Sequence, residues 1–178
     1  EAERLGMALA VHSATQGLDL VGADAYEKFI SVHTYTFPVS MMRQFTSVVF
    51  AGVAERFPNL KVGWMESGCT WLPFWLDRMD SEWAKRGDVE APALTMRPTE
   101  AIRRAPWYFH AEADESQIAI AIKVLGADKL FYASDWPHWD HEYPESLDEM
   151  LNRNDVSYDE KRLLARETAL AMYSLSFP

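Results

Sequence analysis

The sequence has almost no cysteine, since Cys69 is the only one in 178 residues. A lone cysteine excludes an intrachain disulfide framework and is typical of proteins kept in a reducing compartment, so we expect a cytoplasmic location. As a nucleophile, Cys69 would need a general base fixed beside it. No recognisable motif provides one, and a small packing residue is the favoured interpretation.

Basic residues are also scarce. Seventeen Lys and Arg stand against 27 Asp and Glu, which gives a formal net charge of −10 and disfavours a nucleic-acid or anionic-membrane partner. No apolar run approaches the roughly 18 residues of a membrane span, and the start "EAERLGMALAVH" lacks the basic-then-apolar order of a signal peptide. We expect a small-molecule substrate as the partner.

Glycine and proline are few, at 8 and 9, while 48% of the residues are hydrophobic, which favours one folded domain over residues 1–178. Short, nearly continuous apolar runs predict strands covered on both faces, at 7–12, 61–67, 107–112 and 130–134. Helical patterns lie between and after them, at 39–56, 70–84, 114–129 and 157–175. The segment 85–98 is predicted to be a loop. This alternation indicates an α/β fold with a parallel sheet.

Chemically capable side chains stand where the predicted strands end: His12, Glu66, His110, Glu112 and Asp135. Ligands of parallel α/β folds bind at these carboxyl ends. Buried imidazoles and carboxylates need a partner or a metal, so His12 and Asp135 are candidates for half of a Zn²⁺ or Mn²⁺ site. A hydrogen-bonded structural histidine is the alternative for His12, and His110 is equally compatible with a side chain that only faces the interior.

Glu66 is a candidate general acid or base, because flanking tryptophans would shield it and raise its pKa. The alternative is a partner for the dipole of the helix that follows "SGCTW". His33 is either a pocket residue or a loop histidine without a function. Trp136 and Trp139 flank Asp135 and are candidates for apolar pocket walls.

Two motifs, "ERFPNLKVGWMESGCTWLPFWLDRMD" and "LFYASDWPHWD", resemble the amidohydrolase-related family. This branch of the amidohydrolase superfamily includes aminocarboxymuconate semialdehyde decarboxylase and the resorcylate decarboxylases. The resemblance covers nearly the whole chain. It implies a (β/α)8 TIM barrel with one catalytic divalent metal, commonly zinc or manganese.

The resemblance also implies residue roles. His12 matches the metal ligand of the fifth barrel strand, and Asp135 matches the ligand of the eighth strand, which also takes a proton. His138 and Trp136 would shape the substrate pocket. Arg78 lies about where decarboxylase relatives carry an arginine for the substrate carboxylate, in some cases across a dimer interface.

The sequence departs from the family at two points. Glu66 occupies the position of a catalytic histidine on the sixth strand, and the metal-binding His-x-His or Glu-x-His pair of the first strand is missing. The chain is therefore expected to supply strands five to eight, without the N-terminal half. Because such a half-barrel has two open edges, we expect upstream sequence or a homo-oligomer, such as a dimer, to close them.

The resulting functional hypothesis is a metal-dependent hydrolase that activates water to attack an amide, ester or lactone carbonyl. Non-oxidative decarboxylation of an aromatic or unsaturated acid is the alternative. A catalytically inert barrel fragment is a second alternative, because half of the metal site is not in the sequence.

Overall fold

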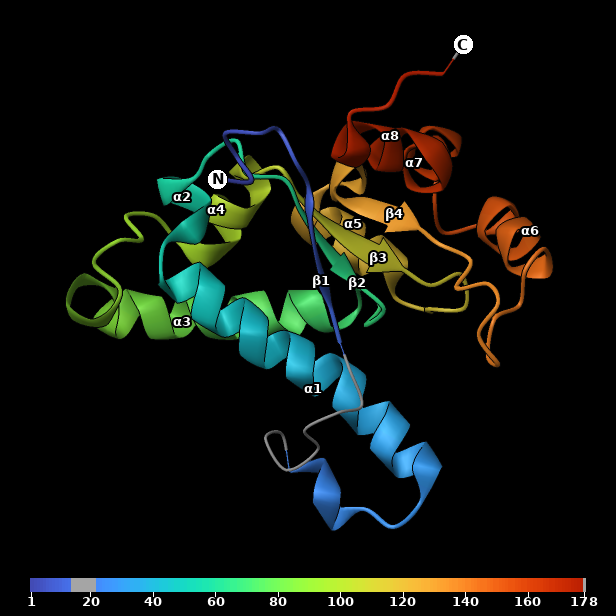
Figure 1. Ribbon diagram of the computed structural model, residues 1–178, viewed down its shortest axis with the longest axis horizontal. Coiled ribbons are helices and arrows are strands. Elements are labelled where there is room, and N and C mark those ends of the chain that lie inside the picture. Colours follow the sequence, from blue (N-terminus) through green and yellow to red (C-terminus); the bar gives the residue numbers. More distant parts are fainter. Residues whose placement is uncertain (14–21, 178) are drawn as a thin grey trace.

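The computed structural model describes residues 1–13 and 22–177, in which strands and helices alternate (Figure 1). The strands are β1 (Leu9–His12), β2 (Val62–Met65), β3 (Trp107–Ala111) and β4 (Leu130–Tyr132). The helices are α1 (Phe29–Phe50), α2 (Val53–Arg56), α3 (Trp71–Glu90), α4 (Pro98–Arg104), α5 (Ile118–Leu125), α6 (Glu145–Asn152), α7 (Tyr158–Arg162) and α8 (Thr168–Tyr173). Short segments η2 (Ala23–Ala25) and η3 (Ala127–Lys129) are 3-10 helices, and η4 (Leu163–Glu167) is a π-helical turn.

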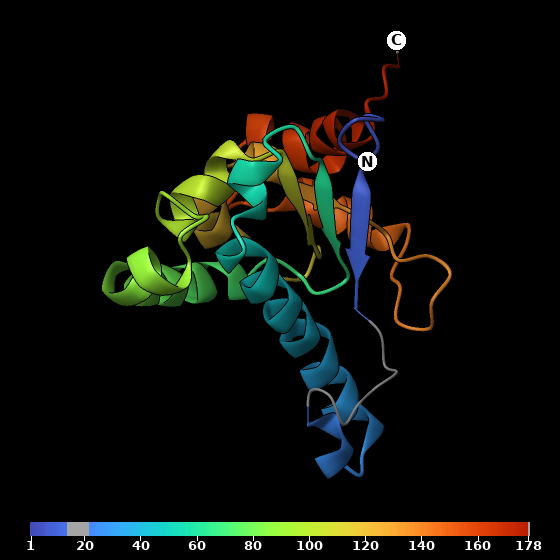
Figure 2. The ribbon, with the colours of Figure 1, turned by 60° about the vertical axis from the view of Figure 1, so that its left-hand side comes forward.

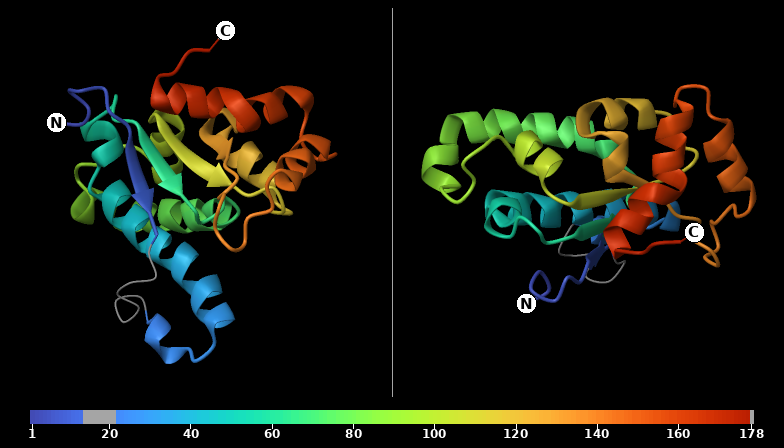
Figure 3. Two further views of the ribbon diagram at one scale, coloured as in Figure 1. Left: turned by 45° about the vertical axis from the view of Figure 1, so that its right-hand side comes forward. Right: turned by 90° about the horizontal axis from the view of Figure 1, so that it is seen from above.

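The four strands form one parallel sheet in the order β1-β2-β3-β4 (Figures 1 and 3). Leu9 pairs with Val62 at one edge, and Phe109 pairs with Leu130 at the other. All four predicted strands are present, and each is up to two residues shorter at an end than expected. The prediction of an α/β fold with a parallel sheet is confirmed.

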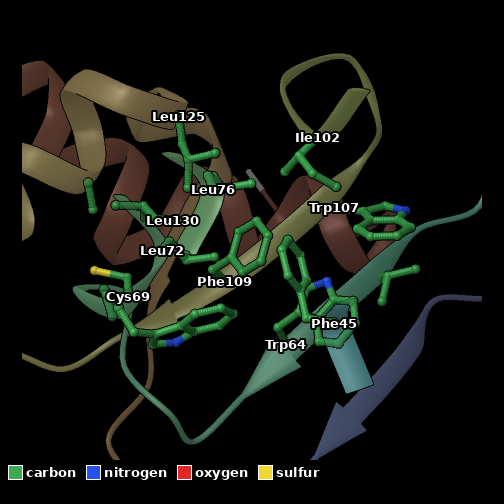
Figure 4. Close-up of a cluster of buried hydrophobic side chains, with 14 of the residues drawn as sticks. Phe45, Trp64, Cys69, Leu72, Leu76, Ile102, Trp107, Phe109, Leu125 and Leu130 are labelled. Atoms are coloured by element: carbon green, nitrogen blue, oxygen red, sulfur yellow. The ribbon is translucent and has the colours of Figure 1, made fainter. Parts of the chain in front are cut away.

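An aromatic core fills the face of the sheet that α1 and α3 cover (Figure 4). The Phe45 ring of α1 lies 5.0 Å from the Trp64 ring and 5.4 Å from the Trp71 ring, both edge to face. Trp64 in turn stacks on Phe109, with ring centroids 6.3 Å apart. Such contacts add to the burial energy of large apolar side chains, so this face holds the sheet rigid below the loops.

A second, smaller core lies on the opposite face, where Met172 of α8 packs with Tyr108 and Phe131. Gly63 has no side chain, and this lets Met172 of α8 pack directly on the sheet. A Cβ atom at Gly63 would stand 2.0 Å from the Met172 Cε atom, so a larger residue would force the end of the Met172 side chain to move. The C-terminal helix thereby packs against β3 and β4.

Helix α1 differs most from its predicted position. It begins at Phe29, ten residues before the expected start, and it contains Pro38 in its interior. Its first turns project past the carboxyl end of β1 (Figures 1 and 2). Proline cannot donate a backbone hydrogen bond, but the helix continues through this residue.

The predicted loop 85–98 is only partly a loop, because helices extend into both of its ends. Helix α3 continues to Glu90, and α4 begins at Pro98, where proline fits the first turn because its missing N–H has no intrahelical partner. A capping box begins α7, since the side chains of Ser157 and Glu160 each accept a hydrogen bond from the other residue's backbone N–H group. No helix in the described part of the chain is long and apolar enough to cross a membrane.

Candidate active site

A cavity of about 810 Å³ opens at the carboxyl ends of the strands. Its walls come from all four strand ends, from α1 and from the loop between β4 and α6. Five of the seven residues proposed from the sequence border this cavity: His12, His33, Glu66, Asp135 and His138. The topology of the sheet therefore brings together side chains that are up to 126 positions apart in the chain.

Glu66 and Asp135 share an unusual backbone conformation. Their φ angles are 52° and 54°, and among the described non-glycine residues only Ser174 is also left-handed. Side chains are disfavoured in this region by about 1–2 kcal/mol, and such strain gathers at functional sites. Both residues directly follow a strand or its extension, so the sharp turn directs each carboxylate toward the cavity.

His12 and Glu66 form an ion pair between the ends of β1 and β2. Nε2 of His12 lies 2.8 Å from Oε1 of Glu66, and Nδ1 contacts the backbone oxygen of Ser13. Partial burial opposes protonation of His12. The bond to Glu66, the Ser13 carbonyl and the negative charge of Asp135 outweigh this effect and raise the pKa of His12.

Asp135 and His138 form a second pair, with 2.7 Å between Oδ1 and Nδ1. This hydrogen bond and the charge of Asp135 raise the pKa of His138. One ligand atom from each of Glu66, Asp135 and His138 lies within 4.8 Å of the others, which is the spacing of a possible metal site. Oxygen and imidazole ligands of this kind suit zinc and manganese.

His110 and Glu112 occupy the cavity wall between these pairs, at the end of β3. Burial lowers the pKa of His110, which favours its neutral form. Glu112 is exposed as a residue, but partial burial of its carboxyl group and the charges of Glu115 and Asp114 raise its pKa to about 7. Glu112 can therefore hold a proton near neutral pH.

The carboxylate of Glu115 lies at the N-terminus of α3 and interacts with the helix dipole. This role is the one that the sequence suggested as the alternative for Glu66. Its carboxylate accepts hydrogen bonds from the backbone N–H groups of Cys69 and Thr70, at 2.8 and 2.9 Å, and of Glu112, at 3.0 Å. The dipole of α3 is thus compensated by Glu115, and Glu66 remains available to the cavity. Burial raises the pKa of the nearby Cys69 thiol, as fits a packing residue.

Aromatic rings make the cavity wall opposite the strand ends. His33 of α1 packs between Phe29, Phe37 and Trp139, with ring centroids 5.3, 4.7 and 5.6 Å away. Nε2 of His33 also lies 3.7 Å from the Asp140 carboxylate. Because Trp139 and Asp140 belong to the loop that carries Asp135, His33 connects α1 to that loop.

Two of the proposed substrate-binding residues lie elsewhere. Trp136 is 65% exposed and does not line the cavity, although Trp139 of the same loop does. Arg78 lies on the exposed side of α3 and pairs with Glu82 at 3.1 Å. Within the described chain, Arg78 therefore has no contact with the cavity, and its assignment remains a prediction tied to a partner surface.

The sequence leaves the roles of His110, Glu112 and Trp139 open, and all three line the cavity. The position of His110 and Glu112 at a strand end was a usable signal, but it does not separate an interior side chain from a cavity wall. The choice between Trp136 and Trp139 depends on the course of an irregular loop, which no periodicity encodes.

The family model described as Amidohydrolase matches residues 1–175. The chain therefore belongs to the amidohydrolase family. It is 27% identical over 137 residues to 2-amino-3-carboxymuconate-6-semialdehyde decarboxylase of Dictyostelium discoideum, a match that covers 77% of this chain and 36% of that protein. The recognition of the amidohydrolase superfamily from two motifs is confirmed.

Two solved structures show the same fold. The 5-carboxyvanillate decarboxylase of Sphingomonas paucimobilis has a TM-score of 0.74 and 23% identity, over 98% of this chain and 51% of that one. A dihydroxybenzoic acid decarboxylase of a Polaromonas species, solved with manganese and 2-nitroresorcinol, has a TM-score of 0.71 and 16% identity, over 97% and 51%. The chain spans about half the length, or less, of the proteins that it matches.

Proposed function

We propose that this chain carries the active-site loops of a metal-dependent decarboxylase, which removes carbon dioxide non-oxidatively from an aromatic or unsaturated acid. The observation that carries the proposal is the pairing of His12 with Glu66 and of Asp135 with His138 around one cavity. The names of the matched relatives favour decarboxylation over hydrolysis of an amide, ester or lactone.

The side chains of the cavity fit a divalent metal. We propose His12 and Asp135 as ligands. Asp135 belongs, with Glu66 and His138, to the cluster that has metal-ligand spacing, and His12 adjoins this cluster through its 2.8 Å contact with Glu66. Six carboxylates line the cavity, namely Glu66, Glu112, Asp114, Asp135, Asp140 and Glu142. An anionic substrate would be repelled by this cluster. A bound Zn²⁺ or Mn²⁺ supplies the positive charge that offsets the repulsion and orients the substrate carboxylate.

Glu66 is the proposed proton donor, in the place where relatives carry a histidine. In this structure the carboxylate accepts a hydrogen bond from Nε2 of His12, while Nδ1 of His12 faces the Ser13 carbonyl. If Nε2 of His12 were a metal ligand, its hydrogen bond to Glu66 would be lost and the Glu66 carboxyl group would be free to face the substrate. As the bond to the carboxylate carbon breaks and carbon dioxide leaves, Glu66 protonates the carbon that keeps the electron pair, and water restores its proton.

The aromatic side of the cavity, formed by residues such as Phe29 and Trp139, is suited to a flat substrate. Phe29 and Trp139 are 59% and 75% exposed, which is unusual for such large rings and gives an apolar surface facing the acidic strand ends. A planar acid can lie against this surface with its carboxylate toward Asp135 and His138. This arrangement places the bond that breaks beside the proposed proton donor.

We also propose that β1 to β4 correspond to the fifth to eighth strands of a (β/α)8 barrel, and that residues 1–178 act as one domain of it. The share of the relatives that the chain spans supports this assignment, as does β1, which has a hydrogen-bonded neighbour on one side only. Closure of the open edges by upstream sequence or by a second subunit would complete the site. The cytoplasm remains the expected location.

Metal analysis and product analysis test this function. The purified full-length protein is expected to hold about one equivalent of zinc or manganese. Asp135→Ala and His12→Ala are expected to lose it, whereas Asp88→Asn on the exposed part of α3 keeps it. Release of carbon dioxide from aromatic acids, without hydrolysis of esters or lactones, is the expected activity. A metal-free wild type favours the inert fragment, and ester or lactone hydrolysis alone favours the hydrolase.

A further inference from the structure

One loop, residues 133–144, carries Asp135 and His138 into the cavity, and the residues that flank it are joined by a hydrogen bond. The Tyr132 hydroxyl, on the last residue of β4, lies 2.8 Å from the Ser146 hydroxyl, on the second residue of α6. Both of these residues line the cavity. The point at which the loop leaves the sheet is therefore tied directly to the point at which it returns to the fold.

Burial makes this hydrogen bond difficult to replace with a bond to water. Ser146 is only 9% exposed, and Tyr132 is half-buried. A hydroxyl group that is taken out of water destabilises the fold unless another polar group pairs with it. Each hydroxyl here is the partner of the other, so the removal of one leaves the other unpaired at the base of the loop.

Helix α6 is itself anchored at two places, so it can act as a support. Met150 of this helix is fully buried in the main core. Arg153, directly after the helix, donates from Nη1 to the backbone oxygen of Ala113 at 2.7 Å, and its guanidinium group also donates to Asp155 at 3.0 and 2.8 Å. Ala113 follows β3 and lines the cavity. Helix α6 thereby connects the loop after β4 with the loop after β3, beyond the carboxyl ends of both strands (Figures 1 and 3).

We propose that Tyr132 and Ser146 are positioning residues of the candidate active site. Their hydrogen bond fixes the base of the loop between the sheet and the anchored helix α6, and it thereby holds the carboxylate of Asp135 where a metal ion can bind. Neither hydroxyl acts on the ion or on the substrate directly. The inference rests on the proposed function only in taking Asp135 as a metal ligand.

The loop needs such a tie because its best-formed polar contact is internal. Asp135 and His138 pair with each other at 2.7 Å, but both belong to the loop, so this pair moves with it. His33 of α1 contacts the loop nearer its middle. A bond at the base removes loop conformations that would carry a ligand atom away from the ion, and a metal site binds more tightly when its ligands are held in place beforehand.

Amide hydrogen exchange in the metal-free full-length protein tests the role of this bond. Tyr132→Phe and Ser146→Ala each remove one of the two hydroxyls. A single neutral hydrogen bond shifts a local equilibrium by about three- to tenfold, so exchange in residues 134–144 should quicken by about this factor in each variant. The amides of β2 and β3 should keep their wild-type rates, because the loop opens without unfolding the sheet.

Ser40→Ala is the matched control. The Ser40 hydroxyl is also part-buried and also takes part in hydrogen bonds, to the Ser13 hydroxyl at 3.0 Å and to the Phe37 carbonyl at 3.2 Å, but it lies on α1, away from the loop. Its removal should leave exchange in residues 134–144 unchanged.

A double variant and manganese binding separate positioning from a general loss of stability. Tyr132→Phe combined with Ser146→Ala should exchange no faster than the faster single variant, because both changes remove the same bond. Calorimetry on the full-length protein should show manganese affinity lowered about three- to tenfold in both single variants and within about twofold of wild type in Ser40→Ala. Unchanged loop exchange in both single variants, effects that multiply in the double variant, or a loss of affinity in Tyr132→Phe alone would each overturn the proposal.

These outcomes are distinct from a failure of the proposed function. If the protein binds no manganese but the loop loosens in both single variants, the positioning pair stands and metal-dependent decarboxylation is wrong. If the protein binds manganese and releases carbon dioxide while the loop is unchanged in both variants, decarboxylation stands and the positioning pair is wrong.

Discussion

Nε2 of His12 and the Glu66 carboxylate lie 2.8 Å apart and join the carboxyl ends of the first two strands. The same nitrogen atom is the one that an ion would need, since Nδ1 faces the Ser13 carbonyl. If His12 is a metal ligand, as proposed, binding of the ion would replace the hydrogen bond between His12 and Glu66. Four predictions address this site and the structure that supports it.

Replacement of Glu66 by glutamine tests its role as proton donor. Glu66→Gln keeps an acceptor for His12 but removes the acidic proton, so we expect kcat for carbon dioxide release to fall by about 10²–10⁴-fold while KM stays within about threefold. Steady-state kinetics measure both. Glu142→Gln, at another carboxylate that lines the cavity, should leave kcat nearly unchanged. A fully active Glu66→Gln would rule out this donor.

Loss of Glu115 should destabilise the fold. Glu115→Ala removes the acceptor of three backbone N–H groups, those of Cys69, Thr70 and Glu112, and is expected to lower the free energy of unfolding by about 2–4 kcal/mol. Urea denaturation measures the change. Glu100→Ala serves as the control, because its pair with Arg104 is exposed and contributes only about 0.5 kcal/mol. Similar losses in both variants would contradict this account of α3.

Glu112 should make stability depend on pH. Its pKa is raised from 4.5 to about 7, so the folded protein retains a proton that the unfolded chain gives up. The contribution of Glu112 to the free energy of unfolding is therefore most favourable below about pH 4.5. It becomes less favourable as the pH rises from there toward 7.

Glu112→Gln should remove this decline and leave the variant about 1 kcal/mol more stable at pH 8 than wild type. The value is small because Glu112 is exposed to the cavity and solvent screens its charge. Thermal unfolding between pH 5 and 8 provides the measurement. A parallel decline in both proteins would assign it to other groups.

His33 should position the loop that carries Asp135. His33→Ala removes three ring contacts and the pair with Asp140, and we expect KM to rise about five- to tenfold and amide exchange in residues 134–144 to quicken. His33→Phe keeps a ring in place and should restore most of the protection. If neither variant changes exchange in this loop, His33 contacts substrate only.

The sequence was informative where burial imposes a simple pattern. Near-continuous apolar runs identified all four strands, since a strand covered on both faces has no polar side. The positions after these runs located His12, Glu66 and Asp135 at one edge of the sheet. The family resemblance added the metal and the expected chemistry, although relatives favour decarboxylation where the sequence had favoured hydrolysis.

Contacts between residues far apart in the chain could not be predicted from the sequence. The start of α1 at Phe29 depends on packing that overrides Pro38, and the capping of α3 by Glu115 joins residues 45 or more positions apart. The missed helix α4 did have a local signal, Pro98 at its first turn. The contact of Trp139 with His33 depends on tertiary structure alone.

The left-handed backbone at Glu66 and Asp135 has a consequence for the evolution of this protein. Glycine adopts this conformation without steric cost, so Glu66→Gly and Asp135→Gly would each relieve strain of about 1 kcal/mol while abolishing the chemistry. Selection for thermal stability alone would favour glycine at both turns. If these two carboxylates serve the proposed reaction, the strain at both turns is the stability that the protein gives up for turnover.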